Sequence, residues 1–153
     1  MKTLKKFFAL TLSLALCISF AACGSTNSST GSESSTKKLT IGVIQYATHP
    51  SLDNCYTGLV EGLKSAGYVD GENIKIDFKN AQGDVPTADL IANNMVASNY
   101  DMIIGIATPV ATSAYGAASG KIPVVFCAVS DPVKAQLVNS LELSGVNCTG
   151  SSD

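Results

Sequence analysis

The sequence predicts an α/β fold in which a doubly wound, parallel five-stranded sheet has the strand order 2-1-3-4-5. From residue 38 onward, short apolar segments of five to seven residues alternate with helical patterns of about a dozen residues. This alternation is typical of right-handed βαβ crossovers, which build parallel sheets. Two of the short segments are apolar throughout, as expected for central strands that helices cover on both faces.

The five expected strands lie at residues 39–45, 73–79, 101–107, 122–128 and 144–148. The first, LTIGVIQ, is rich in β-branched residues that favour strands. The second, NIKIDFK, alternates apolar and polar residues, which indicates a strand with one wetter face, near an edge of the sheet. The third and fourth, DMIIGIA and IPVVFCA, are the apolar segments, so we expect them at the centre.

Three helices are expected between these strands, at residues 52–66, 86–98 and 108–119. The first carries leucines and a valine at helical spacing and ends before Gly67, and the second opens on a proline. The third is rich in alanine. A fourth, short helix is expected near Pro132, where a proline again suits a first helical turn.

Residues 1–22 have the pattern of an export signal. Three lysines precede a fourteen-residue apolar run, which is too short to cross a bilayer core that requires roughly 20 helical residues. Small residues then precede Cys23. This arrangement resembles a bacterial lipoprotein signal, which implies that the Cys23 thiol is lipidated and becomes the mature N-terminus, although Phe20 replaces the usual leucine. An ordinary export signal with an incidental cysteine is the alternative.

Residues 23–37 are expected to form a lipid-anchor cysteine and a disordered tether. From Gly24 to Thr36 every residue except Glu33 is Gly, Ser, Thr or Asn, and such a segment cannot bury apolar surface. We therefore expect residues 38–153 to form one α/β domain, held by its lipid on the extracytoplasmic face of the cell membrane.

The charge balance excludes a nucleic-acid surface. All ten basic residues are lysines, and the formal net charge is −2. Because three of the lysines lie in residues 1–22, removing that segment lowers the charge by three, to −5. Nucleic-acid binding requires clustered Lys or Arg. The absence of arginine also removes the usual bidentate clamp for carboxylates, so backbone N–H groups, hydroxyls or lysines must hold any bound anion.

Three cysteines, Cys55, Cys127 and Cys148, follow the signal segment. Cys127 lies in an apolar strand, where a free cysteine commonly behaves as a small buried side chain. A disulfide between Cys127 and Cys148 is the alternative, since both end expected strands. The chain has no Cys-x-x-Cys pair and one histidine, so we expect neither a metal site nor a cofactor.

In a parallel sheet of this kind, ligands bind beyond the carboxyl ends of the strands. Thr108 and Pro109 follow the third expected strand and suit the N-cap and first position of a helix. The free N–H groups of that helix could hold a ligand carboxylate, or the pair could be a plain cap with water in front of it. Ser130 and Asp131 follow the fourth strand, and Asp131 could cap a helix or face a ligand ammonium group.

Polar residues also follow the first two expected strands. Tyr46 could stack on a ring in the cleft or close the core, and His49 could contact a ligand or be a loop residue before a proline. Asn80, Gln82 and Asp84 lie in a glycine-containing loop, which is either a turn alone or hydrogen-bonding equipment at the mouth of a site.

Motifs for catalysis are absent from the sequence. It contains no G-x-G-x-x-G, no phosphate loop ending in Lys-Ser or Lys-Thr, and no G-x-S-x-G elbow. An exported flavodoxin-like or hydrolase domain using Ser130 and Asp131 is an open alternative, but no nucleophile–base pair supports it. We therefore expect a protein that binds rather than an enzyme.

The segments at the strand ends carry a resemblance to a known family. NAQGD, IATPVATSAYGAASGKIPVVFCAVSDPVKAQLV and GVNCTGSSD resemble the amino-terminal lobe of ABC-transporter substrate-binding proteins of the tryptophan/tyrosine type. The resemblance covers about residues 38–153. It rests on ATP, SDP and NAQGD at three successive strand ends; one departure is Tyr56, where arginine is common in relatives.

The resemblance implies one lobe of a type I periplasmic-binding-protein fold, in which two lobes close over a small ligand. The implied ligand is an aromatic amino acid such as tryptophan, tyrosine or phenylalanine, and the implied partner is an ABC permease in the membrane. The resemblance implies that the second lobe is missing from this chain, so we expect a truncated product that binds weakly or not at all. A lipid-tethered sensor domain is the alternative role for the same lobe.

Overall fold

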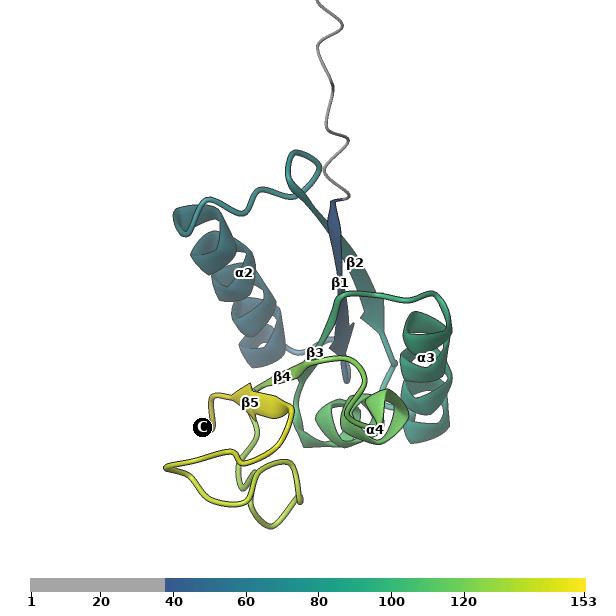
Figure 1. Cartoon of the computed structure of the whole chain (residues 1–153), viewed down its shortest axis with the longest axis vertical. Helices are drawn as coiled ribbons and strands as arrows, with labels where there is room; N and C mark the ends of the chain where they lie inside the picture. Colours follow the sequence, from purple (N-terminus) through teal and green to yellow (C-terminus); the bar gives the residue numbers. More distant parts are fainter. Residues whose placement is uncertain (1–37) are drawn as a thin grey trace, which may run out of the picture. The chain divides into compact units, whose positions relative to one another are not determined.

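The computed structural model describes residues 38–153 (Figure 1). The expected signal segment 1–22, the lipidation site Cys23 and the expected tether 23–37 lie outside the described residues. Within residues 38–153, no helix is both long enough and apolar enough to cross a membrane.

The sheet has five parallel strands in the order β2-β1-β3-β4-β5, which confirms the predicted fold class and strand order. The strands are β1 (Leu39–Gln45), β2 (Ile74–Asn80), β3 (Met102–Ile106), β4 (Val124–Cys127) and β5 (Cys148–Gly150). The two strands with apolar sequences, β3 and β4, lie inside the sheet as expected, and the alternating β2 lies at its edge.

The last strand and the fourth helix differ from the expectation. The strand expected at 144–148 begins only at Cys148, because Asn139 N–H donates to the Ser144 carbonyl and Gly145 has a φ of 65°, so this stretch turns. Near Pro132 the chain forms turns instead of a helix. Gln136, with a φ of 57°, ends that turn because it leaves the helical region.

Three helices connect the strands: α2 (Pro50–Ser65), α3 (Val85–Ala97) and α4 (Thr108–Ala118). The first begins before the expected residue 52 because His49 acts as its N-cap. The Nδ1 atom of His49 accepts a hydrogen bond from Ser51 N–H, 3.2 Å away, and Pro50 supplies a first helical residue that needs no N–H partner. His49 is thus the cap of α2 and not a plain loop residue.

The two faces of the sheet are covered differently. Helix α2 lies on one face, and α3 and α4 lie on the other (Figure 1). Helix α2 has no fully buried residue and packs through half-buried side chains such as Leu59 and Leu63. The opposite face buries five alanines from α3 and α4, namely Ala88, Ala92, Ala111, Ala114 and Ala118.

Helix α4 approaches β3 closely because Gly105 has no side chain. A Cβ placed on Gly105 would lie 2.6 Å from the Ala111 Cα and 2.8 Å from its backbone N. These atoms belong to the backbone of the helix, so they cannot rotate away. The glycine therefore fixes the depth at which the first turns of α4 sit against the sheet.

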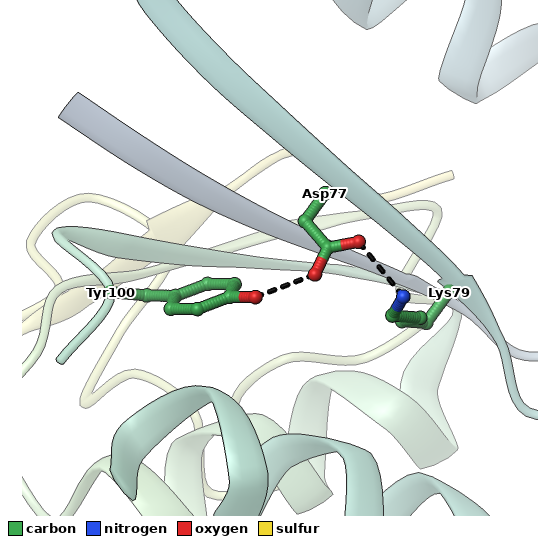
Figure 2. Close-up of polar contacts among 3 residues, drawn as sticks. All are labelled: Asp77, Lys79 and Tyr100. Atoms are coloured by element: carbon green, nitrogen blue, oxygen red, sulfur yellow. Dashed lines mark hydrogen bonds and ion pairs between the residues drawn. The ribbon is translucent and has the colours of Figure 1, made fainter. Parts of the chain in front are cut away.

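A polar cluster ties Tyr100, two residues before β3, to the edge strand β2 (Figure 2). The Tyr100 hydroxyl donates to Asp77 Oδ2 at 2.5 Å, and Lys79 Nζ lies 3.0 Å from Asp77 Oδ1. The Tyr100–Asp77 hydrogen bond holds β2 to the segment that enters β3. Lys79, which lies in β2 itself, engages the other carboxylate oxygen.

Candidate functional site

Backbone hydrogen bonds join the segments that leave the strands at their carboxyl ends. Gly83 N–H donates to the Tyr46 carbonyl (2.7 Å), Tyr46 N–H to the Ile106 carbonyl (3.3 Å), and Ala107 N–H to the Cys127 carbonyl (2.9 Å). We call the residues that these bonds bring to one edge, 46–49, 80–84, 107–109 and 128–131, the carboxyl rim. All eight expected ligand-binding residues lie within these rim segments.

Asn80 and Gln82 belong to a turn after β2 that is tied to the loop after β1. Asn80 Nδ2 donates to Thr48 Oγ1 at 3.2 Å, and Asn80 Oδ1 accepts from Gln82 N–H at 2.8 Å. The Gln82 side chain is exposed, and its backbone has a φ of 57°. The turn thus presents one amide side chain to solvent while the other holds two loops together.

Asp84 is the N-cap of α3, a role that was not foreseen in the sequence. Its Oδ2 accepts hydrogen bonds from Thr87 N–H at 2.9 Å and from Thr87 Oγ1 at 2.6 Å. These bonds, from the Thr87 hydroxyl first and then its backbone N–H, lower the pKa of the Asp84 carboxyl below its ordinary value. One oxygen of this carboxylate is therefore already occupied by the helix that it caps.

Helix α4 starts without a side-chain cap, contrary to the expectation for Thr108. The N-cap is Ala107, which has no side-chain acceptor, and Thr108 and Pro109 are the first two helical residues. The chain leaves β3 so tightly that the capping position falls on Ala107, with φ 87° and ψ 153°. Pro109 has no N–H and Ala111 N–H donates to the Ala107 carbonyl, so the N–H groups of Thr108 and Val110, which have no side-chain acceptor, are the ones open to an anion.

Three of the six non-glycine residues with positive φ in the described part of the chain lie on the rim. Gln82, Ala107 and Ala128 have φ values of 57°, 87° and 54°, and they follow β2, β3 and β4 in turn. Non-glycine residues rarely occupy this region, and each such residue costs about 1–3 kcal/mol. Strained backbone of this kind clusters at ligand sites. The positive φ values therefore support a functional role for the rim, and they could not be predicted from the sequence.

Ser130 and Asp131 close the rim beyond β4, and both are exposed. Asp131 Oδ1 accepts a hydrogen bond from Lys134 N–H at 2.9 Å, and its carbonyl accepts from Ala135 N–H. The carboxylate therefore orders a single turn, and no bond from a side chain engages its other oxygen among the described residues.

Tyr46 is half-buried and packs against the core on the face covered by α3 and α4. Its backbone N–H and carbonyl both bond to neighbouring rim segments. The packing corresponds to the core-closing interpretation of this residue.

Gln45, the last residue of β1, was not singled out in the sequence. Its side chain is 1% exposed, and its Nε2 donates to Ala47 O at 2.8 Å and to Asp53 Oδ1 at 2.7 Å. Both partners are acceptors, so they require the NH₂ group and fix the orientation of the amide. Gln45 follows Ile41 and Val43 at every second position of β1, so the sequence could have predicted that its side chain points toward the same buried face.

The cysteines do not form the disulfide considered between Cys127 and Cys148, and all three are free thiols. Cys148 pairs in register with Val124, three residues before Cys127. That offset places the two about 10 Å apart along the strands, whereas a disulfide requires Cα atoms within about 7 Å. The sheet register therefore rules out this bridge.

Two further observations locate the site. Residues 38–153 contain no group of three or more His, Cys, Asp or Glu side chains that could hold a metal ion. An open groove of about 520 Å³ lies between α3 and α4 and is lined by Asp89, Asn93 and Thr112 among others. Of the expected site residues it includes Pro109 alone, so we place the candidate site on the rim and not in this groove.

Comparisons with known proteins agree with this geometry. Residues 40–153 match the family model described as ABC transporter substrate binding protein. The tyrosine-binding protein of Clostridioides difficile (strain R20291) is 49% identical over 119 residues, which cover 78% of this chain and 34% of that relative. The chain therefore spans about a third of the length of this curated relative.

Two solved structures have similar folds. The ligand-free, open structure of a substrate binding protein with adhesive properties from Clostridium difficile has a TM-score of 0.73 at 47% identity, covering 75% of this chain and 39% of that one. An ABC domain from Streptococcus pneumoniae in complex with L-Trp has a TM-score of 0.72 at 41% identity, covering 76% and 39%. With the family model matched over residues 40–153, the chain belongs to the ABC transporter substrate-binding protein family.

Proposed function

We propose that the chain supplies one ligand-contacting lobe of the solute-binding component of an ABC importer, and that its solute is an aromatic amino acid. Family membership supports the first part of this proposal. A relative named for tyrosine binding and another solved with L-Trp support the second. No enzymatic step is part of the proposed role.

The observation that carries the proposal is the uncapped start of α4 at the centre of the rim. Ala107 offers no side-chain acceptor to the first turn, and the positive end of the helix dipole faces the rim. A ligand carboxylate would accept hydrogen bonds from these N–H groups, which are one of the means left to an arginine-free chain for holding an anion. The close packing of Gly105 on Ala111 holds this helix start in place.

The remaining rim residues supply the complementary contacts in this proposal. Asp131, exposed beyond β4, would attract the ligand ammonium group. The exposed part of Tyr46 would border the aromatic ring, and the amides of Asn80 and Gln82 would donate or accept hydrogen bonds at the rim's far end. Asp84 would act mainly through α3, because its carboxylate caps that helix.

The proposed test is a titration of the ¹⁵N-labelled chain with L-tryptophan, L-tyrosine and L-phenylalanine, followed by NMR chemical shifts. Shifts should concentrate on the rim segments and on the free N–H groups of Thr108 and Val110 at the start of α4. N-acetyl-L-tryptophan amide, which lacks both ligand charges, should bind much more weakly. Shifts confined to the groove between α3 and α4 would refute the proposal.

A matched pair of variants separates the rim from the rest of the surface. Asp131→Asn should weaken binding of the free amino acids, because it removes the charge that faces the ammonium group. Asp89→Asn removes the same charge from the α3–α4 groove and should leave binding unchanged. Equal losses in both variants would indicate a general effect of net charge.

We further propose that Cys23 anchors the protein by a lipid on the extracytoplasmic face of the membrane, where an ABC permease would receive the ligand. The small residues before Cys23 and the apolar run before them support this location. Expression of the full chain in bacteria tests it: Cys23→Ser should move the protein from the membrane fraction to the soluble fraction. Retention of the variant on membranes would argue against the anchor.

A further inference from the structure

Two thiols from distant parts of the sequence meet on the face of the sheet that α2 covers. Cys55 comes from the second turn of α2, and Cys127 is the last residue of β4. Both line the same open apolar groove of about 480 Å³, together with Leu59, Ile104 and Val125. Both are half-buried, so each can be reached from solvent.

The two side chains are neighbours in this groove. Cys127 is close enough to influence the Cys55 thiol, and Ser151 Oγ donates to Cys127 Sγ at 3.7 Å. Burial first, and then the neighbouring Cys127, raises the pKa of the Cys55 thiol above its ordinary value. The Cys127 sulfur therefore has two polar neighbours, one from α2 and one from the segment after β5.

Cys148 is separated from this pair. Its position beside Val124 keeps it away from the end of β4, and it is buried in the core on the face covered by α3 and α4. Burial raises the pKa of its thiol to about 11. Because Cys148 is only 3% exposed, an oxidant cannot reach it in the folded chain, and it is expected to remain reduced under conditions that oxidise the half-buried thiols.

We propose that Cys55 and Cys127 form a disulfide site that ties α2 to the end of β4. A disulfide-bearing oxidant, such as oxidised glutathione or a thiol–disulfide oxidoreductase, accepts the two electrons. The thiolate of one cysteine attacks the oxidant's disulfide and releases a thiol; the thiolate of the other then attacks this mixed disulfide and releases the second thiol. Two protein thiols become one disulfide as one oxidant disulfide becomes two thiols.

The bond acts where the domain is most weakly held. Helix α2 has no fully buried residue, so its attachment depends on the half-buried contacts around Cys55. A bond from Cys55 to Cys127 closes a long loop of the unfolded chain and stabilises the folded state. It also fixes α2, and the His49 cap at its start, against the strand that leads to Ser130 on the rim.

Formation of the Cys55–Cys127 disulfide does not require a bound ligand, so it can be tested without one. The full chain carrying Cys17→Ser and Cys23→Ser is incubated with oxidised glutathione and then digested for mass spectrometry. The expected product is one intramolecular link between the peptides of Cys55 and Cys127, with Cys148 still alkylated by iodoacetamide. Oxidation should raise the melting temperature by roughly 10 °C and slow amide exchange in α2.

Two variants control this experiment. Cys148→Ala should form the same link as the parent chain, and Cys55→Ser should form no link and show no rise in melting temperature on oxidation. A link that includes Cys148, a disulfide-joined dimer, or persistence of both thiols after oxidation of the folded chain would overturn the proposal.

Discussion

The Tyr100 hydroxyl donates a 2.5 Å hydrogen bond to Asp77 Oδ2, and this bond shifts the pKa of both groups (Figure 2). It raises the pKa of Tyr100 from 10.0 to about 12, with burial as the second cause. It also lowers the pKa of the Asp77 carboxyl below 3.8, helped by Lys79 and opposed by burial. The pair is therefore most stable with the tyrosine protonated and the carboxylate charged.

Tyr100→Phe should destabilise the domain by about 1 kcal/mol at neutral pH, since it removes one hydrogen bond to a charged group. The pKa of Tyr100 is raised in the folded state, so its contribution is complete below pH 10 and is lost as the pH rises through about 12. Urea unfolding of both proteins from pH 7 to pH 12 measures this difference.

Tyr100→Phe should also differ less from the parent chain in acid. The pKa of Asp77 is lowered in the folded state, so its contribution is present above pH 3.8 and is lost as the pH falls through the lowered value. The stability gap between the parent chain and Tyr100→Phe should therefore narrow at both ends of the pH range. A gap that stays constant would show that the bond is not made in solution.

Gly105→Ala should destabilise the domain by about 1–3 kcal/mol, because the new methyl group meets the backbone of Ala111 and overpacks the interface. The start of α4 should shift, and the chemical shifts of Val110 and Ala111 should report it. Gly116→Ala is the control: it lies in α4 with open space around it and should stabilise by about 0.5–1 kcal/mol through helix propensity. A neutral effect at Gly105 would contradict the close approach.

Ala107→Gly should stabilise the domain by about 1 kcal/mol or more, since glycine adopts the φ of 87° without strain. Ala117→Gly, in the last turn of α4 where the backbone is helical, should destabilise by up to about 1 kcal/mol. Thermal unfolding of the two variants compares the same chemical change at a strained and an unstrained position. Destabilisation in both would mean that Ala107 carries no backbone strain.

Gln45→Glu should destabilise the domain by about 3 kcal/mol or more at pH 7. The new carboxylate would be buried beside Asp53 and the Ala47 carbonyl, which can only accept hydrogen bonds. Part of the loss should be recovered at low pH, because protonation of the introduced carboxyl group lets it donate again. Gln45→Leu should show no such recovery when both variants are unfolded in urea at pH 4 and pH 7.

Hydrophobic periodicity predicted the sheet because the apolar runs and the turn residues between them mark the same strand boundaries. The strand 39–45 matches the structure residue for residue, and the parallel order follows from the crossover rule. The prediction of a short helix near Pro132 was wrong, because a proline at a possible helix start does not determine whether the helix continues. That outcome depended on Gln136, whose positive φ no composition signal marks.

The rim was predictable only in outline. Thr108-Pro109 correctly indicated where α4 begins, but the capping position fell one residue earlier because the chain leaves β3 with a positive φ at Ala107. His49 and Asp84 cap helices through side chains whose partners are local, so closer attention to capping patterns could have found them. The contact between Cys55 and Cys127 depends on tertiary packing between segments far apart in the sequence, which no local pattern encodes.

Five buried alanines of α3 and α4 face the sheet, and at these positions there is almost no side-chain volume to lose. Truncating a buried side chain there removes at most a methyl group, so cavity-forming substitutions are nearly impossible at Ala88, Ala92, Ala111, Ala114 and Ala118. Enlargement is the damaging direction, because each added methylene pushes a helix away from the strands. Mutational tolerance at these positions should therefore follow side-chain size in one direction only, with Gly and Ser accepted far more often than Val or Leu.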